Sequence, residues 1–153
     1  MKPLGIAPDR IHRLNGEAVP SVAVAEASAE IRRVVPLDPA GVPVLDMIFL
    51  GLGEDGHIAS LMPNAPTAVL ESREPYVRVS NSPKPPPDRL TMTYPVLAAA
   101  KNVWMLATGA AKAEALRDSL RSNGTTPFAR VLCSRPQTII YTDLNEFSPA
   151  RSK

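Results

Sequence analysis

The loop that ends in His57 gathers the residue types of acid–base chemistry into a few positions. Glu54 and Asp55 come just before the histidine. A neutral imidazole, with an unperturbed pKa of about 6.5, accepts a proton from water near neutral pH, and a neighbouring carboxylate can orient its ring. The loop therefore indicates general-base catalysis by His57. The sequence leaves open whether Asp55 or Glu54 orients the ring.

A non-catalytic interpretation of the same loop stands beside the catalytic one. Histidine can bond to loop backbone, and aspartate is common in turns and at helix N-caps. On the loop residues alone, His57 is as well explained by loop capping as by catalysis, and Asp55 is better explained by a turn or N-cap.

Three glycines of this loop, Gly51, Gly53 and Gly56, let the backbone take positive φ angles and approach a ligand closely. Their spacing spells G-x-G-x-x-G, which is also found in dinucleotide-binding loops. That fingerprint requires an acidic residue about 20 positions further on, at the end of the next strand. The next strand-like run, 76–79, is followed by serine and asparagine. Acidic side chains among the glycines would also repel a pyrophosphate, so we set dinucleotide binding aside.

The element that must position the loop is the apolar run 44–50, VLDMIFL, interrupted only by Asp46. The run is short for a helix and is typical of a strand buried on both faces. Ligands of open α/β sheets bind beyond the carboxyl ends of such strands, which is where this loop begins.

The rest of the chain alternates between predicted helices and strands, punctuated by most of its 17 prolines. This pattern predicts a single α/β domain over 1–153, with a Rossmann-like, mostly parallel sheet flanked by helices. The predicted helices are 20–35, 58–62, 94–100 and 110–121, and the further predicted strands are 11–14, 76–79, 102–108 and 138–142.

Residues 46–63, DMIFLGLGEDGHIASLMP, closely resemble the active-site segment of 6-phosphogluconolactonases. These enzymes share a superfamily with glucosamine-6-phosphate deaminases, which continue after G-H-I-A as F-N-E-P with a functional glutamate. Met62 stands where that glutamate would fall, and the resemblance therefore favours the lactonase branch.

Residues 82–95, SPKPPPDRLTMTYP, resemble a second lactonase pattern, a lysine in a proline run followed by an arginine and T-x-T-x-P. Lys84 offers a mobile point charge and Arg89 a planar fork suited to phosphate oxygens. Without the resemblance, both would be interpreted as solvated surface charges.

The resemblance implies hydrolysis of 6-phosphoglucono-1,5-lactone to 6-phosphogluconate in the pentose phosphate pathway. His57 would be the general base that activates water and Asp55 its catalytic partner, with no metal and no cofactor. The expected substrate-binding residues are Gly51, Gly53, Glu54, Gly56, Lys84 and Arg89.

The beginning of the chain, GIAPDRIHRLNGE, resembles an internal lactonase segment. The family's earlier S-G-G-S-T-type phosphate loop has no counterpart here, so the fold is expected to be incomplete relative to the full family domain. This leaves three alternatives: a competent lactonase, a catalytically inactive truncated member that binds a sugar phosphate or a protein partner, and an incomplete product. An incomplete sheet would expose an edge and apolar surface that a homodimer would cover.

Composition narrows the expected partners to small molecules. The chain has 153 residues, 44% hydrophobic, with 17 basic and 15 acidic side chains and a net charge of +2. This balance argues against a nucleic acid or membrane-surface partner. The single cysteine, Cys133, fits the reducing cytoplasm and is predicted to be a buried, inert thiol. No run approaches the length of a membrane span or the apolar core of a signal peptide.

Overall fold

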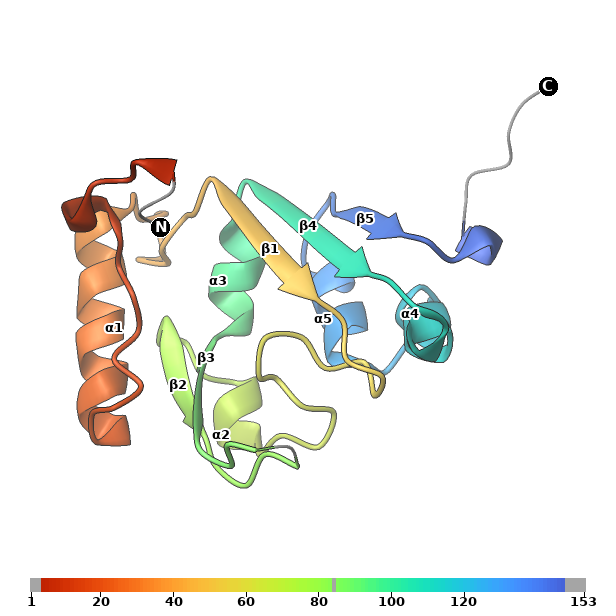
Figure 1. The fold of residues 1–153 in the computed structure, drawn as a ribbon, viewed down its shortest axis with the longest axis horizontal. Coiled ribbons are helices and arrows are strands. Elements are labelled where there is room, and N and C mark those ends of the chain that lie inside the picture. The colour runs from red at the N-terminus through yellow and green to blue at the C-terminus, as the bar shows by residue number, and fades with distance from the viewer. Residues whose placement is uncertain (1–3, 84, 148–153) are drawn as a thin grey trace.

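The computed structural model describes residues 4–83 and 85–147. Its centre is a three-stranded parallel sheet in the order β1-β4-β5, made of β1 (Met47–Gly51), β4 (Asn102–Ala107) and β5 (Ile139–Thr142) (Figure 1). Phe49 lies opposite Trp104, and Trp104 lies opposite Ile139. The predicted parallel α/β architecture and these three strands are confirmed.

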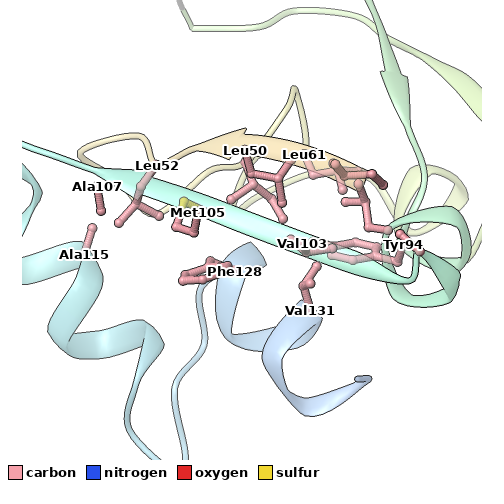
Figure 2. Close-up of a cluster of buried hydrophobic side chains, with 14 of the residues drawn as sticks. Leu50, Leu52, Leu61, Tyr94, Val103, Met105, Ala107, Ala115, Phe128 and Val131 are labelled. Atoms are coloured by element: carbon pink, nitrogen blue, oxygen red, sulfur yellow. The ribbon is translucent and has the colours of Figure 1, made fainter. Parts of the chain in front are cut away.

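Helices cover one face of this sheet: α3 (Tyr94–Ala99), α4 (Ala113–Ser119) and α5 (Pro127–Cys133). Strand side chains alternate between faces, and those on the helical side are buried. Figure 2 shows Leu50, Val103 and Met105 of the sheet meeting Phe128 and Val131 of α5. The hydrophobic core therefore lies between the sheet and these helices.

The opposite face of the sheet is open. Phe49 is 64% exposed, Leu106 48%, Tyr141 45% and Ile139 40%. Trp104 is half-buried between Phe49 and Tyr141, with ring centroids 5.6 and 5.2 Å away. The prediction that the first strand is buried on both faces is therefore wrong, because the described residues place helices on one side only.

A second layer consists of an antiparallel pair, β2 (Tyr76–Val79) and β3 (Arg89–Met92), with α1 (Pro20–Val34) packed against it. The predicted strand over 76–79 is confirmed, but the prediction that it belongs to the parallel sheet is wrong. It pairs instead with β3, which the sequence interpretation missed because prolines dominate the segment before it. The described residues 80–83 and 85–88, several of them prolines, belong to the connection between these two strands.

Several local predictions also need correction. Residues 58–62 do not form a helix but turn back through bridges between Ile58 and both Leu52 and Leu61. Residues 11–14 are not a strand, and α5 was not predicted. Cys133 is exposed, contrary to the expected buried thiol. The remaining short elements are α2 (Thr67–Leu70) and 3-10 helices at Pro8–Arg10, Ala110–Lys112 and Asn145–Phe147.

Arg135 joins the end of α3 to the chain that enters β5. Its side chain donates to the carbonyl oxygens of Leu97 at 3.0 Å, Ala98 at 3.2 Å, Ala100 at 3.0 Å and Gln137 at 2.8 Å. The residue is only 9% exposed. A buried guanidinium thus satisfies helix-end carbonyls that would otherwise lack donors. No helix in the described part of the chain has the length and apolar character needed to cross a membrane.

Candidate active site

The histidine loop begins where β1 ends and is closed by its own backbone. Gly53 donates its N–H to the carbonyl of His57 at 2.8 Å, and Leu52 forms a bridge with Ile58. Leu52, Ile58 and Leu61 are buried in the core. The apolar residues of the loop therefore anchor it, while Glu54 and Asp55 stay exposed at its tip.

Asp55 contacts the ring of His57 directly. Asp55 Oδ1 lies 2.5 Å from Nδ1 of the ring and 3.2 Å from the His57 backbone nitrogen. The carboxylate accepts, so a neutral ring holds its proton on Nδ1 and leaves Nε2 as the basic nitrogen. The sequence left open whether Asp55 or Glu54 orients the ring. In the structure, Asp55 is the residue that contacts it.

The electrostatics of this pair keep Asp55 ionised. Burial raises the pKa of Asp55, but hydrogen bonds from the ring and backbone of His57 and its charge outweigh burial. The pKa of Asp55 consequently lies below its ordinary value. The His57 side chain is 20% exposed and that of Asp55 47%, so both groups are within reach of a ligand from solvent.

Two of the three predicted loop glycines are required by their surroundings. A Cβ on Gly53 would overlap the His57 ring, and Gly56 has a φ of +80°. A Cβ on Gly56 would lie 2.5 Å from Thr126 Cγ2. Gly51 has open space around its Cα and no positive φ. Close packing thus explains Gly53 and Gly56 but not Gly51.

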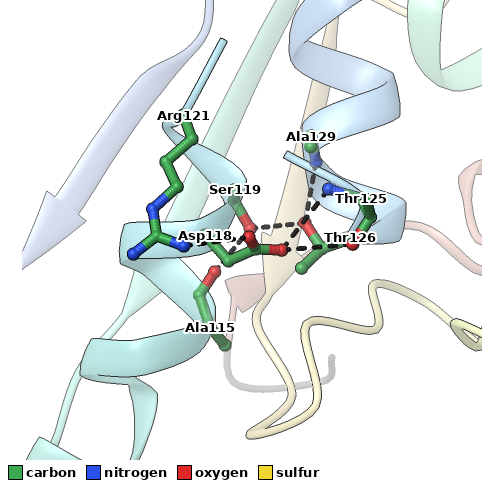
Figure 3. Close-up of polar contacts among 7 residues, drawn as sticks. All are labelled: Ala115, Asp118, Ser119, Arg121, Thr125, Thr126 and Ala129. Atoms are coloured by element: carbon green, nitrogen blue, oxygen red, sulfur yellow. Dashed lines mark hydrogen bonds and ion pairs between the residues drawn. The ribbon is translucent and has the colours of Figure 1, made fainter. Parts of the chain in front are cut away.

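Thr126, which the sequence analysis did not single out, lies close to Gly56 of this loop. Figure 3 shows the hydrogen bonds that hold Thr126 in place. Its Oγ1 accepts the N–H of Ala129 at 3.0 Å and caps α5. Ser119 donates to the carbonyl of Ala115 at 2.6 Å, so in its 2.6 Å contact with Ser119 the hydroxyl of Thr126 is the donor. A threonine followed by proline at a helix start was the sequence signal for this cap.

The second motif lies on the β2–β3 hairpin. Arg89 Nε donates to the carbonyl of Pro86 at 3.0 Å, and Nη2 donates to that of Pro85 at 3.2 Å. The guanidinium is thereby held against the proline turn. Lys84 lies outside the described residues.

The two motifs are joined through Thr91. Its Oγ1 accepts the backbone N–H of Ser60 at 3.1 Å, and the same hydroxyl donates to the Met92 carbonyl at 3.1 Å. Thr91 is 2% exposed. The histidine loop and the hairpin are therefore one structural unit, although the bonded residues are 31 positions apart.

A cavity of about 480 Å³ lies beside Asp55. Its walls come from residues 62–66 of the histidine segment and 79–83 of the hairpin. A larger cleft of about 810 Å³ lies elsewhere, between α1, α3 and α5, and contains none of the predicted site residues. We assign the candidate site to the smaller of these two cavities, because its wall contains Asp55 of the histidine–carboxylate pair and the wall of the larger cleft contains neither residue.

Residues 4–83 and 85–147 contain no group of three or more histidine, cysteine, aspartate or glutamate side chains that could hold a metal ion. Of the predicted site residues, Asp55 lies in the cavity wall, and His57 is joined to the cavity through its contact with Asp55. Arg89 is not among the wall residues but lies on the hairpin whose residues 79–83 form the other side of the cavity.

Comparison with known proteins gives consistent matches. A family model described as glucosamine-6-phosphate isomerases/6-phosphogluconolactonase matches residues 1–140. The 6-phosphogluconolactonase of Streptomyces coelicolor is 39% identical over 123 residues, covering 76% of this chain and 47% of that protein. The human 6-phosphogluconolactonase is 38% identical over 130 residues, covering 84% of this chain and 49% of that protein. The chain thus spans about half the length of these relatives.

Two solved structures are similar to this chain in both fold and sequence. The crystal structure of the devB protein is similar with a TM-score of 0.79 and 31% identity, covering 90% of this chain and 57% of that one. The crystal structure of 6-phosphogluconolactonase from Leishmania guyanensis is similar with a TM-score of 0.70 and 26% identity. The match covers 80% of this chain and 50% of that one.

Proposed function

Because the chain belongs to the glucosamine-6-phosphate isomerase/6-phosphogluconolactonase family, we propose that it hydrolyses 6-phosphoglucono-1,5-lactone to 6-phosphogluconate in the pentose phosphate pathway. The observation that carries the proposal is the contact between Asp55 and His57, in a loop beside a ligand-sized cavity. Relatives named 6-phosphogluconolactonase support the choice of substrate.

In the proposed reaction, His57 Nε2 takes a proton from water as the water oxygen attacks the C1 carbonyl of the lactone. The ionised Asp55 stabilises the resulting imidazolium through Nδ1. The bond between C1 and the ring oxygen then breaks, and the proton on Nε2 passes to that oxygen. The products are a carboxylic acid and a hydroxyl group. A strained ester is already electrophilic, so this chemistry requires no metal or cofactor.

The charged and loop residues would bind the rest of the substrate. Arg89, held by proline carbonyls, presents its guanidinium with little conformational freedom to lose, and with Lys84 it would hold the phosphate. The backbone N–H groups of Gly53 and Gly56 already donate to the carbonyls of His57 and Gly53. The backbone N–H of Glu54 would therefore face the oxyanion, while Gly51, Gly53 and Gly56 would let the loop backbone approach the substrate ring.

The test is the rate of lactone hydrolysis by the purified chain, compared with the spontaneous rate. His57→Ala should lower the enzymatic rate by about 10²–10⁴-fold, the usual contribution of a general base. His12→Ala is the matched control. His12 also contacts a carboxylate, Glu30 at 2.7 Å, but lies outside the loop. Equal loss in both variants, or no loss in His57→Ala, would reject His57 as the base.

A second candidate function is binding without turnover, as a catalytically inactive family member. It is favoured by one observation, that the wall of the cavity contains Asp55 but neither His57 nor Arg89. A folded chain that binds 6-phosphogluconate but gives no rate above background would establish it in place of the enzyme.

We also propose that a second copy of this chain covers the open side of the parallel sheet. Large apolar side chains are exposed on that face, and β1 pairs only with β4 among the described strands. Leu106→Glu, on the open face, should shift the mass in solution toward the monomer. Leu120→Glu should not, although Leu120 at 47% is as exposed as Leu106 at 48%. A monomeric unaltered chain would contradict the proposal.

A cytoplasmic location and a small-molecule partner complete the proposal. They are supported by the single cysteine and by the nearly balanced charge of the chain.

A further inference from the structure

The cleft of about 810 Å³ between α1, α3 and α5 shares no wall residue with the cavity beside Asp55. Its charged wall residues are three arginines and two glutamates, which leave an excess of one positive charge: Arg32, Arg73, Arg130, Glu71 and Glu74. The volume is within the range of small-molecule sites. The sign of this charge indicates an anionic ligand.

Two contacts hold Arg130 in this wall. Its guanidinium carbon lies 4.4 Å from the centroid of the Tyr94 ring, and Nη2 donates to the carbonyl of Leu70 at 3.0 Å. A guanidinium has five N–H donors, so this one bond to a described residue leaves donors for a ligand. Because the side chain is already held in place, it loses little conformational freedom when a ligand binds.

The hydroxyl of Tyr94 is an unpaired donor in the same wall. Tyr94 is 6% exposed, and its hydroxyl has no hydrogen-bond partner among the described residues. The hydroxyl is not one of the atoms that are both fully buried and unpaired, so it keeps some access to solvent, and the cleft lined by Tyr94 provides that access. Burial raises the pKa of Tyr94, so the hydroxyl stays protonated at neutral pH and can donate. A polar group with little water and no protein partner favours a ligand that accepts its hydrogen bond.

The segment between α2 and β2 adds two further donors. Arg73 is exposed and makes no hydrogen bond or ion pair with a described residue. Ser72 Oγ accepts the N–H of Glu74 at 3.3 Å, which leaves its own hydrogen to donate. The carboxylate of Glu74 pairs with Arg32 at 2.8 Å. Among the charged wall residues, Glu71 is therefore the carboxylate that remains to oppose an anion.

These donors match a phosphate group better than a carboxylate. Four side chains of the wall have a hydrogen to donate: those of Ser72, Arg73, Tyr94 and Arg130. A phosphate ester offers three terminal oxygens as acceptors, whereas a carboxylate offers two. The same wall also has apolar side chains, from Ala40, Val42, Leu70, Pro95 and Ala98. A phosphate ester with a compact apolar body would use both parts of the wall.

We propose that this cleft is a second ligand site, which binds a small phosphate ester through Arg130, Tyr94 and Arg73. Arg130 and Tyr94 are the contacts that are in place before the ligand arrives, and Arg73 closes on the phosphate from the exposed side. The site is separate from the candidate active site and does not depend on the proposed function.

The experiment is calorimetric titration of the full chain with phenyl phosphate and with inorganic phosphate. Phenyl phosphate should bind more tightly, because its ring contacts the apolar part of the wall. Arg130→Gln should weaken phenyl phosphate binding about tenfold or more, as expected for hydrogen bonds to a charged group. Tyr94→Phe, which keeps the ring beside Arg130, should weaken it about threefold to tenfold. An unchanged affinity in either variant would overturn the inference.

Two exposed positions test the cleft without altering a contact between described side chains. Arg73→Gln should weaken phenyl phosphate binding about twofold to fivefold, and Glu71→Gln should strengthen it by a similar factor, as expected for exposed charges. Both effects should shrink at high salt. Arg10→Gln is the matched control, because Arg10 is exposed and lies outside the cleft. A change as large in Arg10→Gln as in Arg73→Gln would assign the effect to net charge and overturn the inference.

A last variant separates this site from the candidate active site. Arg89→Gln should leave phenyl phosphate binding in the cleft unchanged, since Arg89 lies on the hairpin beside the other cavity. Lactone hydrolysis, in turn, should be unchanged in Arg73→Gln. Phenyl phosphate binding that is lost in Arg89→Gln and retained in Arg130→Gln would place the phosphate at the hairpin and overturn the inference.

Discussion

The backbone N–H of Ser60 donates to Thr91 Oγ1 at 3.1 Å, and this bond fixes the histidine loop to strand β3. Both residues are almost fully buried, with Ser60 8% and Thr91 2% exposed. Neither end of the bond has ready access to water as a substitute. The position of His57 therefore depends on a hairpin that follows it in the chain.

Thr91→Val should destabilise the chain, because valine fills the same space but leaves the Ser60 N–H without an acceptor. The expected loss is about 1–3 kcal/mol in the free energy of unfolding, measured by chemical denaturation. Thr91→Ser retains the hydroxyl and should recover most of that difference. If valine and serine destabilise equally, packing of the methyl group and not the hydrogen bond is responsible.

Gly53→Ala should displace the His57 ring, because the added Cβ would occupy the position of the imidazole. A displacement of the base by about 1 Å costs on the order of 10²-fold in rate. Lactone hydrolysis and the NMR signals of the His57 ring should both change. Gly16→Ala is the control, since open space surrounds that glycine and its φ is not positive. A Gly53→Ala variant with unchanged ring signals would contradict the close packing of the ring on Gly53.

Asp55 should titrate below the ordinary range of aspartate, because burial raises its pKa by less than the hydrogen bonds and charge of His57 together lower it. In His57→Ala the ring no longer donates while the remaining burial persists, so the pKa of Asp55 should rise. Carboxyl NMR titration of both proteins measures this change. The absence of a rise would mean that the ring does not stabilise the carboxylate.

The same pKa shift fixes the sign of a pH effect on stability. A carboxyl group whose pKa is lower in the folded chain stabilises the fold above its unfolded pKa. That contribution is lost as the pH falls through the folded value. Comparing acid unfolding of the unaltered chain and Asp55→Asn should show this loss only in the former.

Arg135→Leu should destabilise the fold by about 1.5–3 kcal/mol, the range for hydrogen bonds to a charged group. The buried guanidinium donates to helix-end carbonyls of Leu97 and Ala100, which leucine would leave unpaired. Arg121→Leu is the control, because its contact with Asp118 is 3.7 Å long and its side chain is 60% exposed. The control should cost less than about 0.5 kcal/mol. Similar unfolding curves for the two variants would refute the role of Arg135.

Local sequence pattern was sufficient to specify several elements of the fold. The apolar run before Gly51 predicted β1, proline at its start and alanine-rich composition predicted α1, and glycine spacing placed His57 at the carboxyl end of a strand. These features depend on neighbouring residues, whose side-chain period and backbone preferences are present in the chain before it folds.

The surfaces and hydrogen bonds that those elements share depend instead on how the chain packs in three dimensions. Periodicity shows which residues of a strand are apolar, but not that the face of Phe49 stays open while that of Leu50 is covered. It likewise could not pair β2 with β3 across a proline turn. The contact of Asp55 rather than Glu54 with the His57 ring depends on the exact path of the folded loop. The closeness of Thr126 to Gly56 and the hydrogen bond between Ser60 and Thr91 exist only after distant segments have packed together.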